Sequence, residues 1–249
     1  MSIRADYGYD APWFPLLFGC LSVAAGLGAA ILWWQGISRP ALQAAFYFVF
    51  FFANTCSFLY TTRRGKFIEW DRILDQLQLR GAEVVLDMGC GRGAVLAAVA
   101  RRLTIGTVTG IDIWSARDQS GNAEDVTRRN AALEGVESRV RIETADMRAL
   151  PFQDSSFDVV VSSLAIHNIR SNADRRQAIV EAFRVLKPGG RLAIADIRAT
   201  AMYAEVLRGL GATNVERRRL GWRFWWGNPV AATMLITASK NPGRAAASS

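Results

Sequence analysis

The sequence predicts an α/β domain with a doubly wound, mainly parallel sheet, preceded by two transmembrane helices. Two uncharged stretches, at 15–34 and 41–60, each have the length of about 20 residues that crosses a bilayer. From Val84 onward, short β-branched runs alternate with helical stretches, which is typical of a parallel sheet covered by helices. The 249 residues leave room for a membrane segment beside one soluble domain.

The two apolar stretches favour a hairpin in the membrane. Asp6 and Asp10 precede the first stretch and the second follows at once, which argues against a cleaved signal peptide. Gly36 and Pro40 lie between the two stretches, where we expect a tight turn. The small residues of the first stretch and the phenylalanines of the second fit either close helix packing or a lipid-facing surface.

Basic residues predict the orientation of this hairpin. Arg39 is the only basic residue of the turn, whereas Arg4 precedes the first span and Arg63, Arg64 and Lys66 follow the second. By the positive-inside rule both termini are cytoplasmic, and the protein is an integral membrane protein whose soluble domain faces the cytoplasm. The predicted parts are a cytoplasmic N-terminus (1–12), a transmembrane hairpin (13–62), an amphipathic linker helix (63–80), the α/β domain (81–240) and a disordered tail (241–249).

The overall charge and the cysteines exclude few functions. A formal net charge of +8 and a pI near 10.0 fit an anionic membrane surface as well as nucleic acid. Because two spans are predicted nearby, we favour membrane lipids as partners and expect no nucleic acid. Cys20 and Cys56 lie in the apolar stretches and Cys90 in a glycine-rich loop, so neither a disulfide framework nor a metal site is predicted.

A glycine-rich loop follows the first predicted strand. The sequence there is Asp87-Met88-Gly89-Cys90-Gly91-Arg92-Gly93, and a helix follows it. Such a loop lets a ligand approach bare backbone next to the positive end of a helix. Its G-x-G-x-G spacing differs from the G-x-G-x-x-G of dinucleotide-binding folds. The adjacent carboxylate suits a positively charged ligand, such as the ammonium and sulfonium groups of S-adenosylmethionine.

Polar residues also end the next predicted strands. Asp112 follows the second strand, where an acidic side chain can accept both ribose hydroxyls of a nucleoside. Asp146 and Met147 follow the third strand, where they could contact an adenine, although a simple loop aspartate is an alternative. The fourth strand ends at Ser162, at the sheet edge where ligands bind in open α/β folds.

His167, the only histidine, lies just beyond the fourth strand. We predict that it orients or deprotonates an acceptor substrate, and a structural hydrogen-bonding role is the alternative. The segment Phe183–Gly190 is expected to end a helix in a glycine turn. The segment Trp222–Trp226 favours either a membrane interface or substrate entrance, or a buried strand that pairs with 231–239.

Together, VVLDMGCGRG, VTGIDIW, TADM, FDVVVSSLAIHNI and EAFRVLKPGGRLAIADI resemble the successive signature segments of class I S-adenosylmethionine-dependent methyltransferases, nearest to the ubiquinone and menaquinone branch. The resemblance covers about 81–240 and implies a Rossmann-like fold that binds S-adenosylmethionine. Carried over by motif, the cofactor-binding residues are Asp87, Gly89, Gly91 and Gly93 at the methionine part, Asp112 at the ribose, Ile113, Asp146 and Met147 at the adenine, with Ser162 beside them. The two spans depart from the pattern of most soluble relatives.

The predicted function is a membrane-anchored methyltransferase that acts on a small, lipophilic or membrane-associated acceptor. The first alternative is a membrane-bound S-adenosylmethionine sensor or assembly factor without catalysis. An NAD-dependent oxidoreductase is a second, since Asp112 could bind the ribose of NAD, but the glycine spacing and Asp87 speak against it. A nucleic-acid methyltransferase is suggested by the pI alone. The methylated atom and the oligomeric state stay open.

Overall fold

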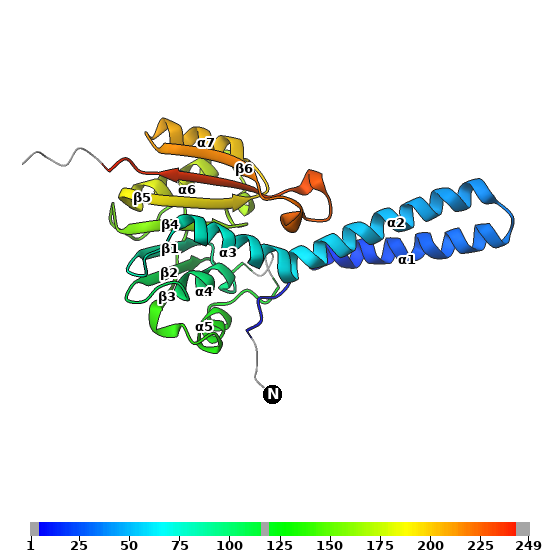
Figure 1. Cartoon of the computed structure of the whole chain (residues 1–249), viewed down its shortest axis with the longest axis horizontal. Coiled ribbons are helices and arrows are strands. Elements are labelled where there is room, and N and C mark those ends of the chain that lie inside the picture. Colours follow the sequence, from blue (N-terminus) through cyan, green and yellow to red (C-terminus); the bar gives the residue numbers. More distant parts are fainter. Residues whose placement is uncertain (1–4, 116–119, 243–249) are drawn as a thin grey trace, which may run out of the picture.

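The computed structural model describes residues 5–115 and 120–242 and has two parts, an α/β domain and a long helical hairpin that projects from it (Figure 1). The predicted disordered tail lies mostly outside the described residues. Helices α1 (Trp13–Trp34) and α2 (Ser38–Tyr60) form the hairpin. Its turn is shorter than predicted because α2 already begins before Pro40, which sits in the first helical turn where its missing N–H is tolerated.

The turn of the hairpin closes in a Schellman motif. Gly36 has a positive φ of 77° and donates its N–H to Trp33, and Ile37 donates to Leu32. Along the hairpin, a Cβ at Gly26 would lie 3.1 Å from the ring of Phe48, so the small residues of α1 allow close packing against α2. At Gly28, by contrast, a Cβ would meet nothing within 4 Å, and Phe46 and Phe52 are exposed, so the described hairpin contains packed and outward-facing residues side by side.

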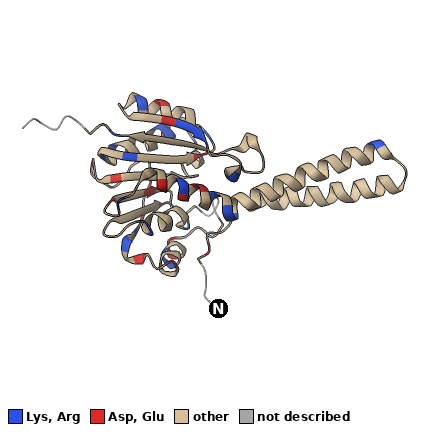
Figure 2. Cartoon of the chain, viewed as in Figure 1, with Lys and Arg blue, Asp and Glu red and all other residues tan. Residues whose placement is uncertain are grey.

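The outer surface of the hairpin is apolar. Figure 2 shows no acidic or basic residue along it except near its tip, where Arg39 lies. Both helices are long and apolar enough to cross a bilayer, by length and composition alone, and most of their side chains are not buried inside the protein. Their insertion in a membrane stays a prediction at this point.

The second helix of the hairpin continues into the domain without a break. One π-helical turn (η1, Thr61–Gly65) joins it to α3 (Lys66–Leu77), which ends at Gln78 with a positive φ of 49°. The predicted amphipathic linker helix is therefore present, and its apolar side is buried against the domain, with Trp70, Ile73 and Leu74 at most 3% exposed. The hairpin is thus joined to the domain by continuous helix.

A seven-stranded sheet forms the centre of the domain, in the order β3-β2-β1-β4-β5-β7-β6. All neighbouring pairs from β3 to β5 are parallel, and β7 runs antiparallel to both of its neighbours. The strands are β1 (Val84–Met88), β2 (Thr107–Asp112), β3 (Val140–Thr144), β4 (Phe157–Ser163), β5 (Leu186–Asp196), β6 (Thr213–Arg219) and β7 (Met234–Ser239). The four strands named from the sequence correspond to β1–β4, a fifth parallel strand, β5, follows them, and β6 was not predicted.

Helices cover both faces of this sheet. Alternating residues of the central strands point to opposite faces, as in β1, where Val85 belongs to one apolar core and Leu86 to the other. The first core lies under α3, α4 (Ala94–Ala100) and α5 (Glu124–Leu133), and the second lies under α6 (Asn172–Val185) and α7 (Thr200–Gly209). This arrangement agrees with the predicted doubly wound domain.

Two segments differ from the expectations. The glycine turn predicted at the end of 183–190 is absorbed into β5, where the pairing with β4 jumps from Leu186 to Arg191 and the residues between them bulge out. The tryptophan-rich segment does not form a strand. It forms the short 3-10 turns η4 (Trp222–Phe224) and η5 (Pro229–Ala231), with a single bridge between Trp225 and Ala232.

Candidate active site

A cavity of about 430 Å³ opens at the carboxyl ends of β1, β2 and β4, close to the point where the strand order reverses. Its walls come from α3, from the glycine loop, from the turns after β2 and β3, and from the segment after β4. Ligands of open α/β folds bind at this place because successive loops diverge there. The cavity is therefore the candidate active site.

The glycine loop forms one wall of the cavity, and at Gly89 there is no room for a side chain. Gly89 has a positive φ of 73°, and a Cβ at this position would lie 2.2 Å from the Cβ of Ala165. The backbone N–H groups of Gly89 and Cys90 both donate to the carbonyl of Ile111, which fixes the loop against β2. Only glycine fits this combination of backbone conformation and close approach.

Asp87 lies at the end of β1, behind the loop, and is only 1% exposed. Within the described residues, neither of its carboxylate oxygens has a hydrogen-bond partner. Burial, and next the nearby charge of Asp112, raise the pKa of Asp87 to about 8. A buried, unpaired carboxyl group on a cavity wall calls for a cationic partner, which the ammonium and sulfonium of S-adenosylmethionine would provide.

Asp112 ends β2 on the neighbouring wall. One carboxylate oxygen accepts a hydrogen bond of 2.9 Å from the N–H of Gly91, and the other accepts bonds from the N–H of Trp114 at 2.7 Å and from Nδ2 of Asn122 at 3.3 Å. The carboxylate is thus held in one orientation and keeps lone pairs for further donors. This geometry suits hydroxyl groups, as predicted for a ribose.

The loop after β3 supplies the third side of the cavity, with Asp146 and Met147 both on its wall. Asp146 is paired with Arg148, whose Nη2 lies 2.6 Å from its Oδ2, and this guanidinium lowers the pKa of the carboxyl. The predicted partner of Asp146, an adenine amino group, would therefore share it with this arginine. Ile113, opposite, is 64% exposed on the cavity wall, where a flat apolar ring could cover it.

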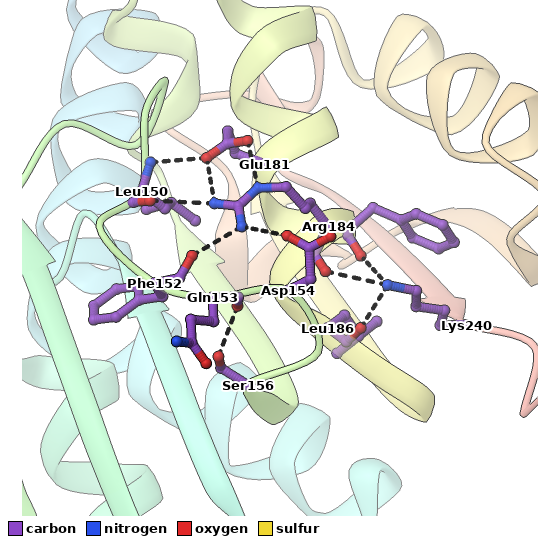
Figure 3. A network of polar contacts seen from close by, with 10 residues as sticks. Leu150, Phe152, Gln153, Asp154, Ser156, Glu181, Arg184, Leu186 and Lys240 are labelled. Carbon is purple, nitrogen blue, oxygen red and sulfur yellow. Dashed lines mark hydrogen bonds and ion pairs between the residues drawn. The ribbon is translucent and has the colours of Figure 1, made fainter.

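A polar network holds the same loop in place from behind (Figure 3). Arg184, on α6, donates to Glu181 and Asp154 and to the carbonyls of Leu150 and Phe152, at 2.7 to 3.1 Å. Glu181 in turn accepts the N–H of Leu150 at 2.8 Å. The loop that carries the predicted adenine contacts is thereby tied to a helix of the domain.

Three predicted site residues are not on the cavity wall. Gly93 has a positive φ of 84° and starts α4, so its part is to shape the loop. Ser162 is 1% exposed, and its hydroxyl donates a hydrogen bond of 2.7 Å to the carbonyl of Met88, which joins β4 to β1. His167 is partly buried, its backbone N–H donates to Asp196, and its Nδ1 lies 2.6 Å from Oδ1 of the same carboxylate. The predicted catalytic role of His167 stays a prediction.

Several residues that line the cavity were not predicted. Asn122 is 8% exposed, and its Oδ1 has no partner among the described residues, so it could accept a hydrogen bond from a ligand. Its position ten residues after Asp112, at the start of a helix, was the only available signal. Phe67 and Trp70 line the cavity from α3, in the segment where only an amphipathic linker helix was predicted.

The N-terminal segment also reaches the site. Asp10 forms an ion pair with Lys66 at the cavity wall, and its Oδ2 accepts a hydrogen bond of 2.7 Å from Thr62. Further along, Asp6 pairs with Arg92 of the glycine loop at 2.9 Å. The segment before α1 therefore docks on the α/β domain beside the cavity.

Comparison with known proteins agrees with this geometry. Residues 86–194 match the family model described as a methyltransferase domain. Methyltransferase GfsG of Streptomyces halstedii is 40% identical over 127 residues, which are 51% of this chain and 42% of that protein. The ubiquinone/menaquinone biosynthesis C-methyltransferase UbiE of Dinoroseobacter shibae is 32% identical over 126 residues, 51% of this chain and 47% of that protein. The chain thus spans less than half the length of these curated relatives.

A solved structure shows the same fold. Geranyl diphosphate C-methyltransferase from Streptomyces coelicolor A3(2), crystallised with S-adenosyl-L-homocysteine, superposes with a TM-score of 0.56 at 17% identity, over 70% of this chain and 75% of that one. The prediction of a Rossmann-like class I methyltransferase fold is confirmed at this level. The matched domain model and the named relatives are described as methyltransferases, and this is what the chain is similar to.

Proposed function

We propose that the chain is a membrane-anchored, S-adenosylmethionine-dependent methyltransferase whose acceptor is a small lipophilic or membrane-associated molecule. One observation carries the proposal: the exposed apolar hairpin and a wall of the cavity belong to a single helix. The apolar stretch of α2 ends at Tyr60, and Phe67 and Trp70 of the same helix already line the cavity. At 1.5 Å per residue, Tyr60 and Phe67 are about 10 Å apart along the helix.

The cofactor side of the proposal rests on the glycine loop and three carboxylates. When bound, S-adenosylmethionine would supply an electrophilic methyl group for in-line displacement. Asp87 would pair with its positive charge, Asp112 with the ribose hydroxyls, and Asp146 with the adenine amino group. The rigid loop and the buried carboxylate contribute mainly by fixing the orientation of the reactants and excluding water.

Part of the remaining cavity wall is apolar. Leu164 and Ile169, from the segment after β4, and Phe67 and Trp70, from α3, line the cavity beside charged residues such as Lys66 and Arg170. The Nε1 of Trp70 donates a hydrogen bond of 2.8 Å to Ser163, which holds the indole in this position. The apolar part suits a ring or an isoprenoid chain. The name of the quinone-biosynthesis relative, although it concerns that protein alone, supports a quinone-like acceptor here.

The docking of the N-terminal segment supports a hairpin whose two ends lie on the same side of the membrane. The segment before α1 bonds to the domain at both Asp6 and Asp10, so the N-terminus and the domain lie at the same end of the hairpin. The basic residues at this end, Arg63 and Arg64, agree with a cytoplasmic location by the positive-inside rule.

The test uses the full chain in nanodiscs. Purified protein would be incubated with S-adenosylmethionine that carries a tritiated methyl group, in discs prepared with a lipid extract of the host. We expect the label to enter the organic phase and to be lost when the extract is replaced by pure synthetic phosphatidylcholine. Label that enters only water-soluble compounds would contradict a lipophilic acceptor.

The same preparation separates the enzyme from the alternative of a sensor. Calorimetric titration with S-adenosylmethionine measures cofactor binding without any acceptor. Binding with no labelled product in any fraction, across a broad set of acceptors, would favour a sensor or assembly factor and would overturn the proposal of catalysis.

A further inference from the structure

The loop between β6 and β7, residues 221–232, forms contacts that neither the cofactor site nor the hairpin explains. We name it the tryptophan loop, since it holds Trp222, Trp225 and Trp226. Figure 1 shows it as the orange loop beside the base of the hairpin, apart from the sheet. It contains one basic residue, Arg223, and no acidic residue.

The first half of the tryptophan loop, residues 222–225, packs against the π-helical turn η1. Thr61 donates a hydrogen bond of 2.6 Å to the carbonyl of Trp225, and the rings of Tyr60 and Trp222 stack with centroids 5.2 Å apart. A Cβ at Gly65 would lie 1.8 Å from the carbonyl oxygen of Arg223. The loop therefore has a fixed position relative to the helix that leads into the hairpin.

The second half of the loop, around Asn228, contacts the hairpin helix α2. The side-chain amide of Asn228 donates a hydrogen bond of 3.0 Å to Oδ1 of Asn54. Asn54 lies within the apolar stretch of α2 and is 4% exposed. The amide of Asn54 donates in turn to the carbonyl of Phe50. A buried amide inside a predicted span is costly without partners, and the loop supplies one.

The rise of α2, compared with the thickness of a bilayer, places the loop near the membrane interface. From Ser38 to Asn54 the helix rises about 24 Å at 1.5 Å per residue. The hydrocarbon core of a bilayer is about 30 Å thick, so a hairpin that crosses it brings Asn54 and its loop partner to the level of the near interface. The next loop residues, Pro229 and Val230, are exposed, the latter by 96%.

We infer that the tryptophan loop is a second membrane contact, which inserts its tip into the headgroup and acyl-chain boundary of an anionic bilayer beside the hairpin. Exposed Val230 provides the apolar tip. Trp222 stacks on Tyr60, about 9 Å closer to the domain than Asn54, and Arg64 and Arg223 add positive charge on this side of the tip, toward the headgroups. This inference rests on the proposed membrane anchoring. With both contacts in place, the cavity, which Lys66 lines, would lie directly above the lipid headgroups.

The test labels single cysteines in the full chain. In a Cys20→Ala, Cys56→Ala background, Cys90 is the remaining, buried cysteine. Val230→Cys, Val49→Cys and Ile105→Cys would each carry an NBD fluorophore in nanodiscs of phosphatidylcholine and phosphatidylglycerol with doxyl-labelled lipids. Val49 lies on the exposed hairpin, and Ile105, at 84% exposure, lies before β2 at the other end of the sheet and is the matched control.

We expect the label at position 230 to be quenched several-fold more by shallow doxyl groups than the label at position 105, and the label at position 49 to be quenched most by deep ones. Quenching at 49 together with a label at 230 that behaves like the control would overturn the inference and leave the anchored hairpin standing. A blue shift at 230 without quenching, in discs with more than one copy, would show a protein contact and would also overturn it. If position 49 is not quenched either, the proposed anchoring itself fails.

Discussion

The carboxylate of Asp112 accepts a hydrogen bond of 2.9 Å from the backbone N–H of Gly91, so the end of β2 holds the glycine loop that follows β1. The residue proposed to bind the ribose is therefore also the residue that shapes the methionine site. A single side chain couples the two halves of the cofactor site, and its removal should damage both.

We expect Asp112→Ala to weaken the binding of S-adenosylmethionine by about 10- to 100-fold, because it removes hydrogen bonds to a charged group, each worth about 1.5–3 kcal/mol. Calorimetric titration of the full chain in nanodiscs measures the change. Asp125→Asn is the control, since this exposed aspartate lies in the first turn of α5, away from the cavity wall. Equal affinities of the two variants would contradict the role of Asp112.

The binding of S-adenosylmethionine should become tighter as the pH rises. The pKa of Asp87 is about 8 in the ligand-free protein, so the carboxyl group is largely protonated at neutral pH and must ionise to pair with a cation. Between about pH 6 and about pH 7.5 we expect the affinity to rise by up to about tenfold per pH unit. Titration across this range measures it, and Asp87→Asn should bind weakly at every pH. A wild-type profile as flat as that of the variant would refute the assignment.

The same carboxyl group should make the ligand-free protein less stable at higher pH. Its pKa in the folded state lies above the value of 3.8 in the unfolded chain, so the folded state binds more protons between these two values. The free energy of unfolding therefore falls as the pH rises from about 4 to about 8. Asp87→Asn should flatten this dependence, which denaturant titrations at several pH values would show, although the variant loses cofactor binding.

His167→Ala tests catalysis against positioning. The predicted role in orienting or deprotonating the acceptor implies a loss of about 10²-fold in kcat, with an unchanged affinity for S-adenosylmethionine. Asp196, whose Oδ1 lies 2.6 Å from Nδ1 of the histidine, should give a similar loss when changed to asparagine. Unchanged turnover with lower thermal stability would instead show that His167 only ties η3 (Ile166–Asn168) to the end of β5.

Arg184→Gln should loosen the loop that carries Asp146. The substitution removes the ion pairs with Glu181 and Asp154 drawn in Figure 3, and we expect a loss of about 1–3 kcal/mol in the free energy of unfolding. Arg176→Gln is the matched control, because its pair with Glu205 is exposed and 3.7 Å long. Faster hydrogen exchange at 145–156 in the first variant only would support the assignment, and equal exchange in both would contradict it.

The contribution of Arg184 also has a predicted pH dependence. Its guanidinium lowers the pKa of Glu181 below the usual value, so the pair stabilises the fold above the pKa of the unfolded chain and loses this effect in acid. The difference in stability between wild type and Arg184→Gln should therefore shrink as the pH falls below about 4.5. Urea titrations of both proteins at acid and neutral pH would measure it.

Local patterns predicted the parallel part of the sheet and the acidic residues at its edge. The first three strands are short runs with an aspartate at or just beyond the end, and parallel strands end at one edge, so Asp87, Asp112 and Asp146 all line one cavity. The contacts that escaped prediction join distant parts of the chain. The N–H of Asp6 bonds to Asn130, 124 positions away, and no local pattern encodes such a contact.

The errors at segment boundaries have a different cause. A glycine pair after a proline normally marks a turn, yet β5 takes up Lys187–Gly190 as a bulge because its neighbours pair with both β4 and β7. For the tryptophan-rich segment a buried strand was one of the alternatives, but its side chains pack on the base of the hairpin instead. In both cases the tertiary environment overrides local preference.

The continuous helix from Ser38 to Leu77 sets the rotation of the domain relative to the hairpin. An added residue in the hairpin half of that helix would rotate everything beyond it by about 100° and advance it by about 1.5 Å. The side of the hairpin toward which the cavity opens is thus set by the number of residues in this helix. A flexible tether of equal length would let the domain turn relative to the hairpin, whereas a continuous helix allows one orientation.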